Sequence, residues 1–596
     1  MRSGGSGNCG RWLLAMAITL IGAFFSPILR AATGVDVILY NATVWTVDAK
    51  HPSAQAVAIR GDRIFRVGED TDILRLKNSH TKLIDLHGQM LLPGFNDAHT
   101  HFENAIEWFF QVQLPDVHDQ ELMTKRLRET VAHVPTGLWI TGGGDWDLHA
   151  SEDAESKGDG SFHPFDPDLA TIDSASGTHP VLFRRYDHVY FANSLALQRA
   201  RITENTPDPR GGRYGRNSQT HKLNGLLYGT AGELVARLVS PLSEAQKLVG
   251  ARGFIHELNA VGITSIQDIA RVDEIWNRHI FPTDSERSYS NMTIFLDLMR
   301  EGSLSVRVYP QLPLTTWKDL ASVGIYPGSG NTTIHYGSLK DFTDGSYMLD
   351  PYANRPSFSG NWSYRFVGED EIQKNIVEAD KARYDIGVHV IGDKALHELL
   401  DWYENAIRLN GPRDRRFRLI HVEFATLQDL QRAARMHMVA DITPNLLLSN
   451  PAGISAMLGP DRETTAFAWR TMIENGVKLD IVSDLPGLYS HEEVAPFDPL
   501  ANIYYAVTRV PVAGGVPWHP EQALTIPEAI EAYTANPAYA SHEENIKGTI
   551  TAGKLADLVV VSKDIVHACS PEELRSAKVT LTMLGGRIVY QRPDSR

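Results

Sequence analysis

Two histidines one residue apart follow an apolar segment in "QMLLPGFNDAHTHF". Because side chains alternate between the two faces of a β-strand, His99 and His101 are expected to project to the same face. Two adjacent imidazoles repel each other as cations and pack poorly as neutral rings, but together they can begin a metal site. The chain holds 23 histidines, so an accidental pair is the alternative, and further ligands must decide between the two readings.

Short strand-like segments alternate with helical segments through the middle of the chain. Eight such strands with crossover helices predict an α/β fold of the (β/α)8 TIM-barrel type. An open, doubly wound sheet is the alternative, but no Gly-rich dinucleotide turn follows the first strand. The predicted strands are 94–101, 262–269, 307–313, 334–345, 385–393, 418–424, 439–445 and 479–487.

The carboxyl ends of these strands carry further residues that bind metals. Active sites of barrels of this type lie at that end, where side chains from different strands converge. A buried core histidine is individually commoner than a ligand, but the joint placement at one end favours a metal site. Strands one, four, five, six and eight supply His99 with His101, Lys340, His389, His421 and Asp484.

The remaining parts of the chain predict two additions to the barrel domain, which we place at residues 94–539. Short strands and tight turns at residues 32–93 and 540–596 predict a small β-sandwich domain built from both termini. The gap of about 160 residues between the first two strands predicts an insertion at about 104–250. An insertion in the first βα loop would sit over the mouth of the barrel, and we interpret it as a substrate lid.

The first residues have the layout of a secretory signal peptide. Arginines flank the apolar "WLLAMAITLIGAFF", and "LRAAT" offers small residues for cleavage. We therefore interpret residues 1–31 as a leader and expect a secreted or periplasmic protein, with an uncleaved anchor as the alternative. Cleavage would leave Cys569 as the single cysteine, so no internal disulfide is expected.

Composition and net charge argue against some classes of binding partner. The chain has 596 residues, 43% of them hydrophobic and 22% charged, which fits a globular protein. Its formal net charge of −15 argues against nucleic-acid binding and against a basic membrane-binding patch. We expect a small-molecule substrate and no stable membrane insertion after cleavage, and a homodimer remains open.

With these motifs assembled, the chain resembles the amidohydrolase superfamily of metal-dependent hydrolases, and within it the amidohydrolase-3, YtcJ-like family. The resemblance runs from about Asp36 to Arg592. It implies a (β/α)8 barrel with a bipartite β-sandwich and a divalent metal centre, usually zinc. The matching pieces are "LLPGFNDAHTHF", "RYDHVYFANSLAL", "VGITSIQDI", "LKDFTDGS", "VHVIGDKAL", "RLIHVEF", "IVSDLP" and "GTITAGKLADLVVV".

The resemblance also implies a role for each ligand. His99 and His101 would bind the buried metal, and Lys340, as its carbamate, would bridge two metals. His389 and His421 would hold the more exposed ion, while Asp484 would be both ligand and proton shuttle. The expected cofactor is therefore two divalent ions bridged by carboxylated Lys340, or one ion. Asp341 follows Lys340 where such proteins have an aliphatic residue.

The chemistry of such a centre predicts hydrolysis of a non-peptide amide or related C–N bond. A metal-bound water loses its proton near neutral pH, and the resulting hydroxide can attack a carbonyl while Asp484 accepts and delivers the proton. No G-x-S-x-G motif occurs, so a serine nucleophile is not predicted. An esterase or lactonase with the same centre and a non-catalytic secreted binding protein are the alternatives.

Five more polar or aromatic residues are candidates for substrate contact, and each also has a structural interpretation. Trp146 can be core of the lid, Arg184 can pair with Asp187 on a surface, and Asp393 can cap a helix. The candidates are Trp146, Arg184, His188, Asp344 and Asp393.

Overall fold

The fold is that of a computed structural model. Residues 1–33 lie outside the described part of the chain, and with them the predicted leader; His188, Asp344 and Cys569 also lie outside it. No helix among the described residues is long and apolar enough to cross a membrane. The structure describes residues 34–114, 116–144, 146–147, 164–185, 189–269, 290–343, 369–447, 451–486, 497–512, 514–567 and 570–593.

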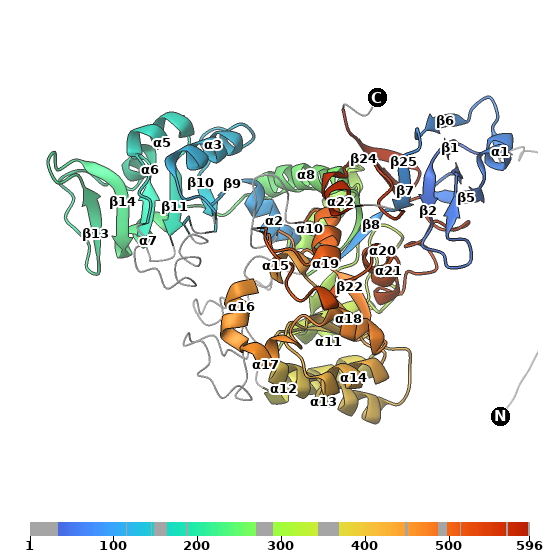
Figure 1. Ribbon diagram of the computed structural model, residues 1–596. Helices are drawn as coiled ribbons and strands as arrows, with labels where there is room; N and C mark the ends of the chain where they lie inside the picture. Colours follow the sequence, from blue (N-terminus) through green and yellow to red (C-terminus); the bar gives the residue numbers. More distant parts are fainter. Residues whose placement is uncertain are drawn as a thin grey trace, which may run out of the picture.

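Parallel strands form the centre of the molecule (Figure 1). Every one of the eight predicted strand segments overlaps at least one of them. They pair in the orders β8-β15-β16 and β17-β18-β19-β20-β21-β22. The strands are β8 (Phe95–Thr100), β15 (Ile263–Asp268), β16 (Arg307–Val308), β17 (Gln311–Pro313), β18 (Ser338–Phe342), β19 (Asp385–Val390), β20 (Arg418–His421), β21 (Val439–Ile442) and β22 (Lys478–Ile481).

Isolated parallel bridges link these two sheets. Ile269, directly after β15, bridges Gln311 of β17, and Thr100 of β8 bridges Leu485 beyond β22. The backbone N–H of His101 also donates to the Leu485 carbonyl at 2.8 Å. The first and last of the parallel strands are therefore neighbours in space.

Helices follow most of the parallel strands and pack apolar faces on them or on one another. In α13, Leu396, Leu399, Leu400 and Tyr403 are buried, which is the i, i+3, i+4, i+7 spacing of one helix face. Ser243 and Gln246 form a capping box that starts α8. The helices are α2 (Phe102–Phe109), α8 (Glu244–Ala260), α10 (Ser290–Glu301), α11 (Trp317–Ser322), α12 (Glu369–Lys381), α13 (Asp393–Asn410), α14 (Leu427–Arg435), α18 (Trp469–Glu474) and α20 (Ile526–Ala532).

Two further sheets are formed near the ends of the described chain, and one of them combines strands from both ends. β7 (Met90–Pro93) pairs antiparallel with β23 (Leu558–Val561). Leu39, Val57, Leu91 and Leu558 belong to one hydrophobic cluster drawn from both sheets. The other strands are β1 (Val37–Tyr40), β4 (Ala56–Arg60), β5 (Arg63–Gly68) and β6 (Lys82–Asp85) in one sheet, and β2 (Thr43–Trp45), β3 (Ser53–Ala54), β24 (Val579–Leu584) and β25 (Arg587–Gln591) in the other.

The insertion between β8 and β15 contains a lobe with its own sheet, which stands to one side of α2 and α8 in Figure 1. Its ordered elements span residues 111–236, within the predicted 104–250, and Leu182, Leu227 and Val235 share a core of their own. The lobe comprises β9 (Gln111–Gln113), β10 (Ile140–Gly143), β11 (Val181–Arg185), β12 (Val189–Ala192), β13 (Gly212–Arg216), β14 (Leu223–Gly229), α3 (Gln120–Val131), α5 (Leu169–Ser176), α6 (Ser194–Arg199) and α7 (Thr230–Ala236).

Short helices complete the described chain. They are α1 (Asp70–Ile73), η1 (Leu74–Leu76), η2 (Leu314–Thr316), α15 (Pro444–Leu447), α16 (Pro451–Leu458), α17 (Pro460–Glu463), α19 (Pro499–Thr508), η3 (Pro520–Gln522), α21 (Ala535–Ala540) and α22 (Pro571–Ser576).

Candidate metal centre

The His-x-His pair lies at the carboxyl end of β8 and faces Asp484. The Nε2 atom of His99 lies 3.1 Å from Asp484 Oδ1, and that of His101 lies 3.3 Å from the same oxygen. The side chain of His99 is 1% exposed, whereas that of His101 is 17% exposed. The two imidazoles thus converge on one carboxylate, His99 from the interior and His101 from nearer the surface.

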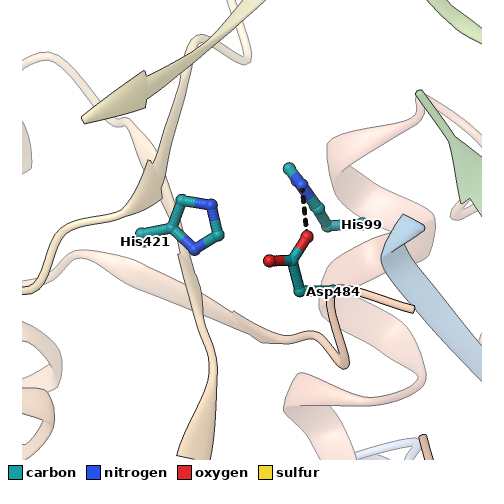
Figure 2. A group of neighbouring side chains, drawn as sticks. All are labelled: His99, His421 and Asp484. Carbon is teal, nitrogen blue, oxygen red and sulfur yellow. Dashed lines mark ion pairs between the residues drawn. The ribbon is translucent and has the colours of Figure 1, made fainter. Parts of the chain in front are cut away.

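His421 completes a compact group at the end of β20. His99, His421 and Asp484 each offer one ligand atom, and these atoms lie within 4.8 Å of one another (Figure 2). The ring of His389, from β19, has its centroid 4.6 Å from that of His421. Four of the predicted strand ends therefore bring imidazole or carboxylate groups to one place.

Two of these residues adopt a backbone conformation that is uncommon for side chains with a Cβ. His421 has φ +80° and Asp484 has φ +55°. Non-glycine residues in this region carry strain, which persists where surrounding contacts enforce it and is frequent at functional sites. The bent backbone at both strand ends turns the two side chains toward His99.

His99, His389 and His421 are held in the neutral form that binds metal ions. Burial lowers the pKa of His99 and His389 well below the usual value for histidine. Burial also lowers the pKa of His421, to about 4. An imidazole must be unprotonated to ligate a metal, so at neutral pH these side chains need no proton release before binding.

Asp484 remains an anion in this setting. Burial raises the pKa of its carboxyl group, but the imidazoles of His101 and His99 lower it more, and the pKa lies well below its usual value. A carboxylate surrounded by neutral imidazoles is a donor set that suits zinc and similar divalent ions.

Lys340 lies in the middle of β18 with its amine buried, 3% exposed as a residue. Burial lowers the pKa of this lysine to about 7, although the carboxylates of Asp484 and Asp441 oppose the shift. A large part of the amine is therefore unprotonated at neutral pH, which is the form that can react with CO2. Asp341, the adjacent residue on the strand, projects to the opposite face.

Buried polar atoms without a hydrogen-bond partner indicate whether these residues could form a metal site. Buried polar atoms nearly always have a hydrogen-bond partner, so unpartnered ones call for an explanation such as a bound ion. Within the described residues, three such atoms on ligand candidates have no partner: His99 Nδ1, Lys340 Nζ and His389 Nε2. The residues present fit a cation that would engage this group.

Two aspartates that sequence reasoning missed hold the centre in place. Asp97 accepts hydrogen bonds from the backbone N–H of His99 at 3.3 Å and of Ser483 at 3.2 Å, which ties β8 to the segment bearing Asp484. Asp268 accepts from the N–H of Phe102 at 2.7 Å and fixes the turn after His101. The signal for Asp97 was its position two residues before His99, on the same face of the strand.

Of the predicted substrate residues, the structure describes Trp146, Arg184 and Asp393, and each of these has a structural contact or position away from the histidines. Trp146 is buried in the lobe, where its Nε1–H donates to the Phe165 carbonyl at 2.9 Å. Arg184 lies on β11 of the same lobe and is exposed. Asp393 starts α13, and its Oδ2 contacts the Arg462 guanidinium closely, which leaves this carboxylate paired.

Known proteins resemble this chain in sequence or in fold. The chain is 28% identical over 588 residues to N-substituted formamide deformylase from Arthrobacter pascens, covering 94% of this chain and 99% of that one. It is 28% identical over 553 residues to YtcJ of Bacillus subtilis (strain 168), named as an amidohydrolase, with 87% and 93% coverage. A solved metal-dependent hydrolase from Pyrococcus furiosus superposes with a TM-score of 0.63 at 21% identity, covering 89% and 99% of the two chains.

The family model described as the amidohydrolase family (Amidohydro_3) matches residues 82–590, from the amino-terminal strands to the last strand of the chain. This match includes both sheets of parallel strands and every residue of the candidate centre. The chain therefore belongs to the amidohydrolase family and is a hydrolase of that family.

Proposed function

We propose that this protein hydrolyses a small, non-peptide amide at the centre formed by His99, His101, His389, His421 and Asp484, with Lys340 as a further ligand. The observation that carries the proposal is the convergence of His99, His421 and Asp484 within 4.8 Å. A bound divalent ion, for which zinc suits these donors, would polarise the substrate carbonyl and lower the pKa of a water molecule.

Asp484 is the proposed proton carrier. Its carboxylate is the anion between two imidazoles, and its side chain is 22% exposed, so that a water or substrate can reach it. It would accept a proton at Oδ1 or Oδ2 from the attacking water and deliver it to the leaving nitrogen. His99 and His101 hold the carboxylate in this orientation from one side.

The architecture supports this placement at the carboxyl end of a closed barrel. We infer that the two parallel sheets are parts of one (β/α)8 barrel, supported by the bridges Ile269–Gln311 and Thr100–Leu485. The shared apolar cluster of the terminal sheets supports a bipartite β-sandwich at 32–93 and 540–596, with the barrel at 94–539. The lobe would then cover the barrel mouth as a lid.

Export belongs to the same proposal. The apolar segment before "RAAT" supports cleavage close to Ala32 and a secreted or periplasmic protein. N-terminal sequencing of the native protein would show a start near Ala32. A native chain that still begins with Met1 would contradict export by cleavage.

Purified protein with its native metal tests the reaction. We expect metal bound in proportion to protein and turnover of members of an amide panel that includes N-substituted formamides, with activity lost on chelation and restored by zinc. Matched esters and lactones in the same assay distinguish an amidohydrolase from an esterase. A protein that binds metal and hydrolyses neither class would contradict catalysis and leave a binding protein.

A further inference from the structure

A cavity of about 260 Å³ lies beside the candidate centre, between the loop after β20 and helices α16 and α17. Its apolar wall includes Phe424, Leu427 and Leu458, and its polar residues include Arg462 and Asp393. A volume of this size accommodates a substituted aromatic ring or a branched aliphatic group. Most ligand pockets combine such an apolar wall with a few polar groups that fix orientation.

Two residues that line the cavity lie just after the carboxyl ends of β19 and β20, the strands that carry His389 and His421. Phe424 follows His421 of β20 by three residues, and Asp393 follows His389 of β19 by four. Phe424 also bridges Ala466, which fastens the segment after α17 to this strand end. Residues that line the cavity therefore follow closely after two of the strands that carry the histidines.

Arg462 carries the unusual polar feature of this cavity. Its Nη2 contacts Asp393 Oδ2 closely, while Asp393 Oδ1 accepts the backbone N–H of Lys394 at 2.9 Å. Its other terminal nitrogen, Nη1, is buried and has no hydrogen-bond partner within the described residues. A buried donor without a partner is costly, so an acceptor that reached Nη1 from the cavity would gain binding free energy.

The pairing with Asp393 decides which acceptor fits best. Asp393 is 5% exposed and already balances the charge of the guanidinium. A ligand carboxylate would add a second anion against one cation and would lose its hydration in doing so. A neutral carbonyl or amide oxygen accepts the Nη1 hydrogen without that penalty, because hydrogen bonds from a charged donor are strong even to neutral acceptors.

We propose that this cavity is a substrate subsite that takes an apolar, ring-sized group bearing a neutral hydrogen-bond acceptor. Arg462 is the specificity-determining donor, and Asp393 is a positioning residue that holds the guanidinium and excludes carboxylate-bearing groups. The assignment rests on the proposed amide hydrolysis, because the group in the cavity belongs to the same substrate.

Binding of three ring-sized probes to the holoenzyme tests the assignment directly. Benzamide offers a neutral acceptor, benzoate a charged one and toluene none. We expect benzamide to bind about tenfold more tightly than toluene, the gain expected of one hydrogen bond to a charged donor, and more tightly than benzoate. Equal dissociation constants for benzamide and toluene would overturn the proposal.

Two variants separate the donor from its positioning residue. In Arg462→Met the preference for benzamide over toluene should vanish. In Asp393→Asn, which keeps the side-chain shape and removes the negative charge, the affinity for benzoate should rise about tenfold or more relative to benzamide. An unchanged ratio in either variant would overturn the proposed roles.

Arg470→Met is the matched control. Arg470 also forms a bidentate pair with a carboxylate, Glu528, but does not line the cavity, so its variant should keep the wild-type preference. A crystal structure with benzamide should show the ring against Phe424 and the amide oxygen at Arg462. A ring found at the histidines instead would overturn the subsite. If the probes bind as expected but the protein hydrolyses no amide, the proposed reaction is contradicted and the proposed subsite is not.

Discussion

Asp484 is the residue that links the geometry of the centre to its chemistry. Asp484→Asn replaces the proton acceptor by a neutral amide of the same shape. We expect kcat to fall by about 10²–10⁴-fold, the usual contribution of a general base, while metal remains bound. Turnover assays together with metal analysis would measure this, and Asp564→Asn on the exposed His567 pair serves as control. Near-normal kcat with metal bound would show that another group moves the proton.

The proposed number of metal ions depends on Lys340. The histidines are neutral, so a carbamate on Lys340 would add an anion to that of Asp484 and could bridge two cations. We expect Lys340→Ala to lower bound metal and activity, and formate or acetate to restore part of both. The exposed Lys563→Ala should behave like the wild-type protein in the same metal analysis. A variant that keeps its full metal content would contradict the bridging role.

At the scale of elements, an ion pair couples helix α18 to helix α20 and makes stability depend on pH. The hydrogen bond from Arg470 lowers the pKa of Glu528 to about 2, and Glu528 also closes the capping box of Thr525. Because the folded-state pKa lies below the unfolded value of 4.5, the stabilisation is present above pH 4.5 and is lost as the pH falls toward 2.

We predict that removing this ion pair lowers the melting temperature, and that the difference from the wild-type protein becomes smaller as the pH falls. Glu528→Gln should melt below the wild-type protein at pH 7, and the difference should decrease between pH 5 and pH 3. Calorimetry across this range measures it, with Glu531→Gln at an exposed position of the same helix as control. A difference that stays constant with pH would show that the cap, and not the ion pair, stabilises α20.

At the scale of the whole molecule, the lobe can be separated from the centre. Part of the lobe has a core of its own, around Leu182 and Leu227, whereas Val181 and Phe183 belong to the main hydrophobic cluster. The helices that flank the lobe, α2 and α8, pack on each other. Replacing residues 111–236 by a short Gly/Ser linker should leave metal binding intact, because the ligands lie on the parallel strands. Substrate preference should change, since the proposed lid is removed.

Metal analysis and a substrate panel on the linker variant measure both outcomes. Circular dichroism is the control that the parallel sheets remain folded. Loss of metal from a folded variant would mean that the lobe supplies part of the centre, and an unchanged substrate preference would mean that it does not cover the mouth.

Local patterns in the sequence were sufficient to predict the parallel strands and the group formed by His99, His421 and Asp484. β15, β19 and β21 are almost entirely buried, as their short strand-like segments indicated, and the alternation expected at the end of β8 placed His99 and His101 on one face. Residues that end parallel strands meet without further information, because the carboxyl ends of such strands lie together. The group of His99, His421 and Asp484 follows from that rule.

Contacts between residues far apart in sequence decided the rest. Asp393 was a candidate for substrate contact, but Arg462, 69 residues later, occupies its carboxylate and becomes the donor in the cavity. The strands of the lobe at 111–236 pair with one another. β7 pairs with β23, which lies more than 460 residues away in the sequence. Hydrophobic periodicity determines which face of an element is buried, whereas only the packed chain determines which distant side chain lies against it.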